Sequence, residues 1–148
     1  MKTLTLPGFY ESENFYANLR TQNQQLQIEH LLNYPEESLG FALAEFFAEN
    51  HFGKFYALEP NDIFHVLTQT GISVSDQIGL QFYLIGNGKR SIDTLAIAFL
   101  GSLFYAHRFS FFLKQFKKGK TALLFHQLEF TKMLSLPLSK IRETFLIH

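Results

Sequence analysis

The sequence contains no cysteine and no tryptophan. Disulfides are therefore excluded, and any bound metal would need His, carboxylate or amide ligands. Long hydrophobic runs are also missing. The longest, Leu95 to Ala106, has twelve residues interrupted by Gly101 and Ser102, whereas a membrane-spanning helix needs about 20. The first residues lack the apolar stretch of a secretory signal, so we expect a cytoplasmic protein.

Aromatic residues are abundant, with 18 Phe and six Tyr among 148 residues, and the hydrophobic content of 47% argues against disorder. A chain of this length fits one domain. So many rings either fill a core or line a cavity for an apolar ligand.

Charge is balanced overall but not along the chain. Residues 1–62 carry nine acids and three bases, whereas residues 63–148 carry four acids and ten bases. Such a division favours a charged face for a partner or an anionic surface, or two halves that pack against each other. No basic tract lies in a known nucleic-acid-binding motif, so nucleic acid is not expected as a partner.

Apolar residues recur mainly at helical spacing. Pro35 suits a first helical turn, Ser73 a capping box, and Gly119 a break between helices. Helices are predicted over about 11–32, 35–52, 60–68, 74–86, 91–107, 121–134 and 137–145. We interpret the periodic residues of the fifth helix as its buried face: Leu95, Ala98, Phe99, Ser102, Leu103 and Ala106.

Strand patterns are missing, because no stretch alternates apolar and polar residues between hairpin turns. No internal repeat or flexible linker divides the sequence. The predicted fold is all-α, a single-domain helical bundle of residues 1–148 with short connections.

The sharpest cluster of polar residues is Asn61, Asp62 and His65. On a helix their spacing puts all three on one face, which suits a divalent metal with further ligands from a neighbouring helix. Two structural interpretations remain open. Asp62 is favoured by the dipole at a helix start, and a single His beside Phe64 is often a hydrogen-bonded core residue.

A family resemblance bears on this cluster. Residues 61–68 and 77–82 resemble the metal-binding signature of the ubiquinone biosynthesis family called Coq-four, which is His-Asp-x-x-His followed after a spacer by Glu. The resemblance covers about residues 32–147. It includes three further segments in the family's order: Tyr34–Gly40, Lys118–Lys120 with Leu128-Glu129, and Leu136–Arg142.

The resemblance implies an all-helical, dimer-forming protein that is peripheral to membranes and associated with other quinone-biosynthesis enzymes. Asp62 and His65 match two of the family's metal ligands, but Asn61 replaces the first His and Gln77 replaces the Glu. Both changes weaken zinc binding, because amide oxygens are poor zinc ligands and one negative charge is lost. A divalent metal such as zinc is therefore an open prediction.

Two basic segments are further candidates. Lys89 and Arg90 follow a Gly-Asn-Gly turn and precede a predicted helix, which suits an anion or lipid head group, or simply a helix end and turn. Further along, Phe109, Phe112, Leu113 and Phe116 share a helix face, with Lys114, Lys117, Lys118 and Lys120 around it. Such a helix suits a position on an anionic membrane surface, and we would then expect the inner face of the membrane. Alternatively, its apolar stripe packs into the core of the protein.

Three hypotheses of function follow. In the first, a Coq-four-like scaffold binds a quinone or isoprenoid lipid at the membrane surface. Helices 77–85 and 91–107 would enclose the tail, and the cluster around His65 would face the head group. In the second, Asp62 and His65 hold a metal for decarboxylation or hydroxylation of the quinone ring. In the third, a diverged protein–protein module keeps only the fold. The sequence identifies no catalytic residue.

Overall fold

The computed structural model describes residues 28–51 and 58–148, and within these ranges it contains helices, turns and loops but no strand or sheet. The all-α prediction is confirmed. The elements are α2 (Ile28–Leu31), α3 (Leu39–Glu49), α4 (Pro60–Thr68), α5 (Val74–Gly86), α6 (Ile92–Phe104), η1 (Ala106–Arg108), α7 (Phe109–Thr121), η2 (Phe130–Met133) and α8 (Leu138–Phe145). Most of the predicted helix over 11–32 lies outside the described residues.

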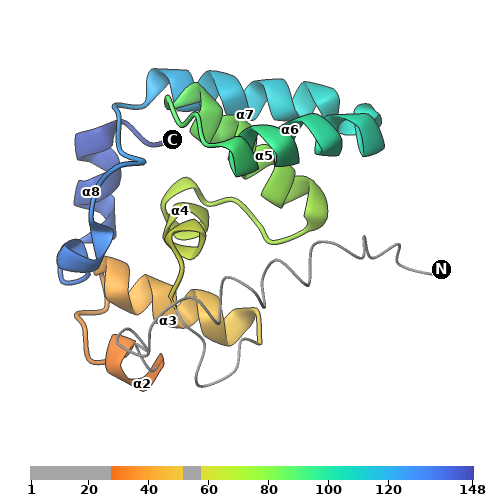
Figure 1. The fold of residues 1–148 in the computed structure, drawn as a ribbon. Coiled ribbons are helices and arrows are strands. Elements are labelled where there is room, and N and C mark those ends of the chain that lie inside the picture. The colour runs from red at the N-terminus through yellow and green to blue at the C-terminus, as the bar shows by residue number, and fades with distance from the viewer. Residues whose placement is uncertain (1–27, 52–57) are drawn as a thin grey trace.

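Helices α5, α6 and α7 lie together on one side of the molecule, α2 and α3 on the other, with α4 between them and α8 along one edge (Figure 1). Helix α5 packs most extensively against α7 and next against α6. The main cluster of buried apolar residues contains residues from most of the elements, but none from α6 or α7. Its largest members include Leu43, Phe47, Phe64, Leu67, Tyr83, Leu84, Phe125 and Ile141.

Helix starts follow the capping residues. Ser73 caps α5, since its Oγ accepts from the backbone N–H of Asp76 at 3.2 Å, as the sequence predicted. Helix α3 begins later than expected. Its cap is Ser38, whose Oγ accepts from the Phe41 N–H at 3.2 Å. Pro35 lies in the preceding turn, where its carbonyl accepts from the Ser38 N–H at 2.8 Å.

Gly119 does not break a helix, and the predicted helix over 121–134 was wrong. Helix α7 continues through Gly119 to Thr121 and is followed by an irregular segment and the 3₁₀ helix η2. Gly119 serves packing instead, because a Cβ built on it would lie 1.9 Å from the carbonyl oxygen of Tyr83 on α5. Gly86 is equally close to α7, with a Cβ 2.2 Å from the Phe116 carbonyl oxygen.

The irregular segment after α7 is held by Asn87, which is buried at the end of α5. Its Nδ2 donates to the Leu123 carbonyl at 2.9 Å, and its Oδ1 accepts from the backbone N–H of Phe125 at 3.1 Å. These bonds satisfy backbone groups that a helix would otherwise have paired. The chain can therefore leave helical geometry here and still place Phe125 in the core.

Candidate functional site

The cluster predicted on α4 is divided by the structure. Asp62 and His65 are both buried and Asn61 is half-buried, whereas Gln77 is exposed at the start of α5. The Gln77 amide donates to the Ile72 carbonyl at 3.1 Å. Among the described residues, no group of three or more His, Cys, Asp or Glu side chains is arranged to hold a metal ion.

Asp62 has a local structural task. It is the third residue of α4, and its Oδ2 accepts from the backbone N–H of the N-cap residue Glu59 at 2.8 Å in a capping box. Its negative charge also lies at the favourable end of the helix dipole. This is the first of the two structural interpretations that the sequence left open.

His65 is a hydrogen-bonded, ring-stacked residue. Its Nδ1 lies 3.2 Å from the Thr70 carbonyl oxygen, which can only accept, so Nδ1 carries the proton in the neutral ring and Nε2 is left as an acceptor. The imidazole stacks on Phe46 at 6.0 Å between centroids. Burial lowers the pKa of His65, although the bond to Thr70 and the negative charge of Asp76 act in the opposite direction. The ring is thereby favoured in its neutral form.

Lys89 and Arg90, the two residues of the predicted anion site, both interact with other groups of the protein. Arg90 Nη1 donates to the Ile85 carbonyl at 3.0 Å near the end of α5, and Lys89 Nζ lies 6.0 Å from the centroid of the Phe64 ring. These contacts fit the helix-end interpretation of this segment. They also place two positive charges directly before α6.

The buried side of helix α6 agrees with the predicted one only at Ala98. Leu95, Phe99 and Leu103, expected inside, are exposed, and the helix buries the small residues Thr94, Ala98 and Gly101. A Cβ built on Gly101 would lie 2.6 Å from Ile78 of α5, so only small residues fit at this contact. The large apolar side chains turned to solvent form what we call the α6 face: Ile92, Leu95, Phe99, Leu100, Leu103 and Phe104.

The side chains of the α6 face are exposed to a large extent. Phe99 has 65% of its surface accessible, Leu103 62% and Ile92 86%. Soluble monomers rarely expose a continuous apolar patch of this kind without a binding role. Residues 89–120, which include α6 and most of α7, carry seven bases and one acid, Asp93.

The four residues of the apolar stripe predicted on α7 differ in how far they are buried. Phe112 is fully buried and Phe116 half-buried, but Phe109 and Leu113 remain exposed. No single helix of the described residues has the length and apolarity needed to cross a membrane. Helix α6 and residues 106–121 have the required length and apolarity only when they are taken together, and the two parts are bent by 103° relative to each other.

The segments that carry the family resemblance have structural roles here. Gly40 lies against the ring of Tyr34, and Gly119 against α5. Arg142 of α8 donates to the carbonyls of Val66 and Leu67 at the end of α4, at 2.7 and 3.0 Å. Comparison of the sequence with protein-family models and with curated proteins gives no match. Membership of the Coq-four family therefore stays a prediction.

Sequence reasoning missed the α6 face because the helix is apolar on nearly every side, so its period does not show which side faces inward. The signal was available in the small residues Thr94, Ala98 and Gly101, which recur at helical spacing. A cavity beside the start of α4 was also missed. His126 lines it, and that residue shows no ligand spacing in the sequence.

Proposed function

We propose that this protein is a Coq-four-like peripheral membrane scaffold that binds a quinone or isoprenoid lipid at an anionic bilayer surface. The observation that supports this most is the α6 face, where large apolar side chains point to solvent. Buried small residues fix this orientation by holding the other side of α6 against α5.

The length of α6 favours a position in the plane of the membrane. Its 13 residues extend about 20 Å, which is shorter than the roughly 30 Å hydrocarbon layer. A helix of this length with one apolar side enters the boundary between head groups and acyl chains. Isoprenoid tails are apolar and lie in the same layer, so the α6 face can contact them there.

Apolar burial alone gives modest binding. Covering the six exposed side chains of the α6 face is worth on the order of 5–10 kcal/mol. This is comparable to one acyl chain, which anchors proteins only reversibly. A second signal is available in the bases that follow α6 in the chain, among them the exposed Lys114, Lys117 and Lys120. Each base near an anionic surface contributes about 1 kcal/mol. The charge therefore favours a lipid surface over an uncharged apolar partner.

Vesicle co-sedimentation tests the proposal. Wild-type protein should bind vesicles of phosphatidylcholine with phosphatidylglycerol, bind neutral vesicles more weakly, and lose affinity as salt is raised. The double variant Phe99→Ser/Leu103→Ser should reduce binding at least about tenfold. The matched control is Val74→Ser/Leu136→Ser, which removes two exposed apolar side chains elsewhere and should bind as wild type does.

Two results would contradict the proposal. One is equal vesicle binding by both double variants. The other is a lipid extract of the purified protein that contains no prenyl or acyl lipid, together with no uptake of added ubiquinone. A stable dimer that the Phe99→Ser/Leu103→Ser variant disrupts, without vesicle binding by the wild type, would instead favour the protein–protein module.

A further inference from the structure

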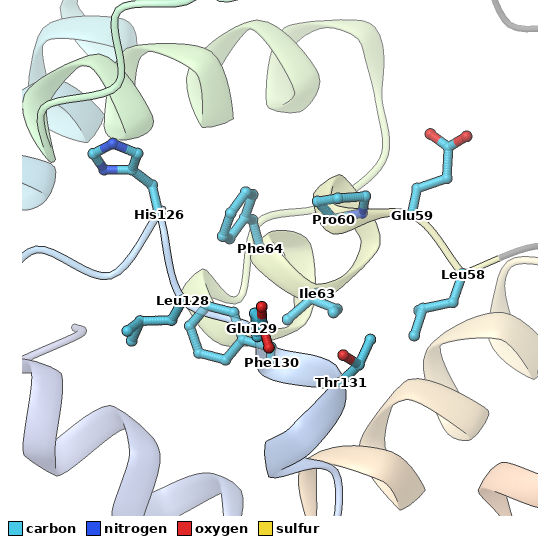
Figure 2. A pocket seen from close by; sticks show the side chains of 10 residues that line it. All are labelled: Leu58, Glu59, Pro60, Ile63, Phe64, His126, Leu128, Glu129, Phe130 and Thr131. Atoms are coloured by element: carbon cyan, nitrogen blue, oxygen red, sulfur yellow. The ribbon is translucent and has the colours of Figure 1, made fainter. Parts of the chain in front are cut away.

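A cavity of about 250 Å³ lies between the start of α4 and the segment that leads into η2. Figure 2 shows Pro60 and Phe64 on the α4 side of it, with Phe130 and Thr131 on the opposite side. No residue of α6 lines this cavity, so its role is separate from that of the α6 face.

The apolar part of the cavity is suited to one aromatic ring. Ile63, Phe64 and Phe130 form its inner wall and are almost fully buried. The two rings meet edge to face, with centroids 6.2 Å apart and planes at 88°. Cavities of about 150 Å³ lined by Leu, Ile and Phe admit benzene. The present volume therefore accepts one substituted ring but not a chain of isoprenoid units.

The polar groups at the cavity are mostly hydrogen-bond acceptors. His126 Nδ1 lies 3.1 Å from the Asn87 carbonyl oxygen, so in the neutral ring this nitrogen donates and Nε2 is the acceptor. Glu129 and Thr131 add a carboxylate and a hydroxyl to the lining, which Glu59 completes at the start of α4. A ligand that donates a hydrogen bond suits these groups, whereas a carboxylate ligand would find few hydrogen-bond donors among them. Glu129 is itself ion-paired with Lys132, and the Glu59 side chain accepts from the α4 backbone.

We propose that this cavity binds a single uncharged aromatic ring that carries a hydroxyl group. The ring packs on Phe64 and Phe130, and the hydroxyl donates to an acceptor at the rim. The size of the cavity limits the ligand to one ring, and the acceptors favour a hydroxyl group on it. The shortage of hydrogen-bond donors selects against a carboxylate. The inference goes beyond the membrane surface function and does not depend on it.

Three small probes test the inference on the full chain: p-cresol, toluene and benzoate. Methyl signals of Ile63 and Leu128 report binding in carbon–proton NMR spectra. We expect p-cresol to shift both with a Kd in the millimolar range, as is usual for so small a ligand. Toluene, which lacks the hydroxyl, should bind about three- to tenfold more weakly. Benzoate should leave both signals unchanged.

Variants at the rim locate the site. Thr131 is exposed, so Thr131→Trp can cover the cavity without disturbing the core and should abolish the p-cresol shifts. Glu129→Gln should weaken p-cresol binding and allow benzoate to bind. The matched control is Glu143→Gln, because Glu129 and Glu143 are both exposed and each pairs with a lysine three residues away.

The proposal is overturned if p-cresol shifts neither methyl, if toluene binds as tightly as p-cresol, or if benzoate shifts the wild-type signals equally. It is also overturned if Thr131→Trp, folded by circular dichroism, binds p-cresol unchanged. Vesicle binding by Thr131→Trp should remain at the wild-type level. The inference on the cavity and the function proposed for α6 can therefore fail separately.

Discussion

Gly101 of α6 lies directly against the Ile78 side chain of α5, where a Cβ would come within 2.6 Å of Ile78 Cγ1. This contact determines which side of α6 faces the protein. Because small residues occupy the contact, the large apolar residues on the rest of the helix are directed outward. The exposed surface of α6 is thus a consequence of how the helix is attached.

Gly101→Ala should destabilise the fold, although alanine is the better helix former by about 1 kcal/mol. Ile78 is buried, so it cannot move freely away from the added methyl group. We expect a net loss of about 1–3 kcal/mol in the free energy of unfolding by urea. Ala96→Leu, on the exposed side of α6, should change it by less than about 0.5 kcal/mol. A more stable Gly101→Ala protein would show that the helices are not in close contact.

Stability should decrease as the pH falls, because His65 is buried in its neutral form. Burial lowers the pKa of the folded protein's His65 below the ordinary value of 6.5. The unfolded state therefore binds more protons below about pH 6.5, and the His65 contribution is lost as pH falls through that range. Above it the contribution is constant.

Urea denaturation between about pH 7.5 and pH 5.5 measures this effect. His65→Gln should show a smaller pH dependence than the wild type, whatever its absolute stability. If the variant does not fold, an NMR titration of the wild-type His65 ring replaces the comparison. A His65 pKa at or above 6.5 would contradict the account.

Metal binding at α4 should be weak. Asp62 is engaged at the helix cap, and Gln77 at the motif's distal position is bonded to the Ile72 carbonyl. Elemental analysis of protein purified without chelator should give less than about 0.1 zinc per chain, with no gain on titration. Stoichiometric zinc that is lost in both Asp62→Ala and His65→Ala would revive the metal-assisted enzyme.

How far the sequence predicts the fold depends on where the determining contacts lie. Capping at Ser73 and the bounds of α4 follow from neighbouring residues, and both were predicted correctly. Gly119 has the same local signature as a helix breaker. Its actual role depends on Tyr83 of α5, a contact between distant segments that a local pattern does not contain.

In the candidate sites, too, some features follow from neighbouring residues and others depend on contacts between distant segments. The spacing of Asp62 and His65 correctly indicated a shared helix, but each side chain is paired with a nearby backbone group. Which side of α6 faces solvent depends on its fit to Ile78. The cavity beside Phe64 depends on a segment some sixty residues further along the chain, since Phe130 forms its other wall. Only the assembled fold shows this cavity.

The central claim is that the α6 face enters a lipid bilayer, and the absence of tryptophan allows a direct measurement. Phe99→Trp places a single indole on the α6 face, and Leu136→Trp places one at an exposed position elsewhere. With anionic vesicles that contain brominated lipid, the emission of the Phe99→Trp variant should shift to shorter wavelength and be quenched, while that of the Leu136→Trp variant stays unchanged. Unshifted, unquenched emission from the indole on the α6 face of vesicle-bound protein would contradict the account.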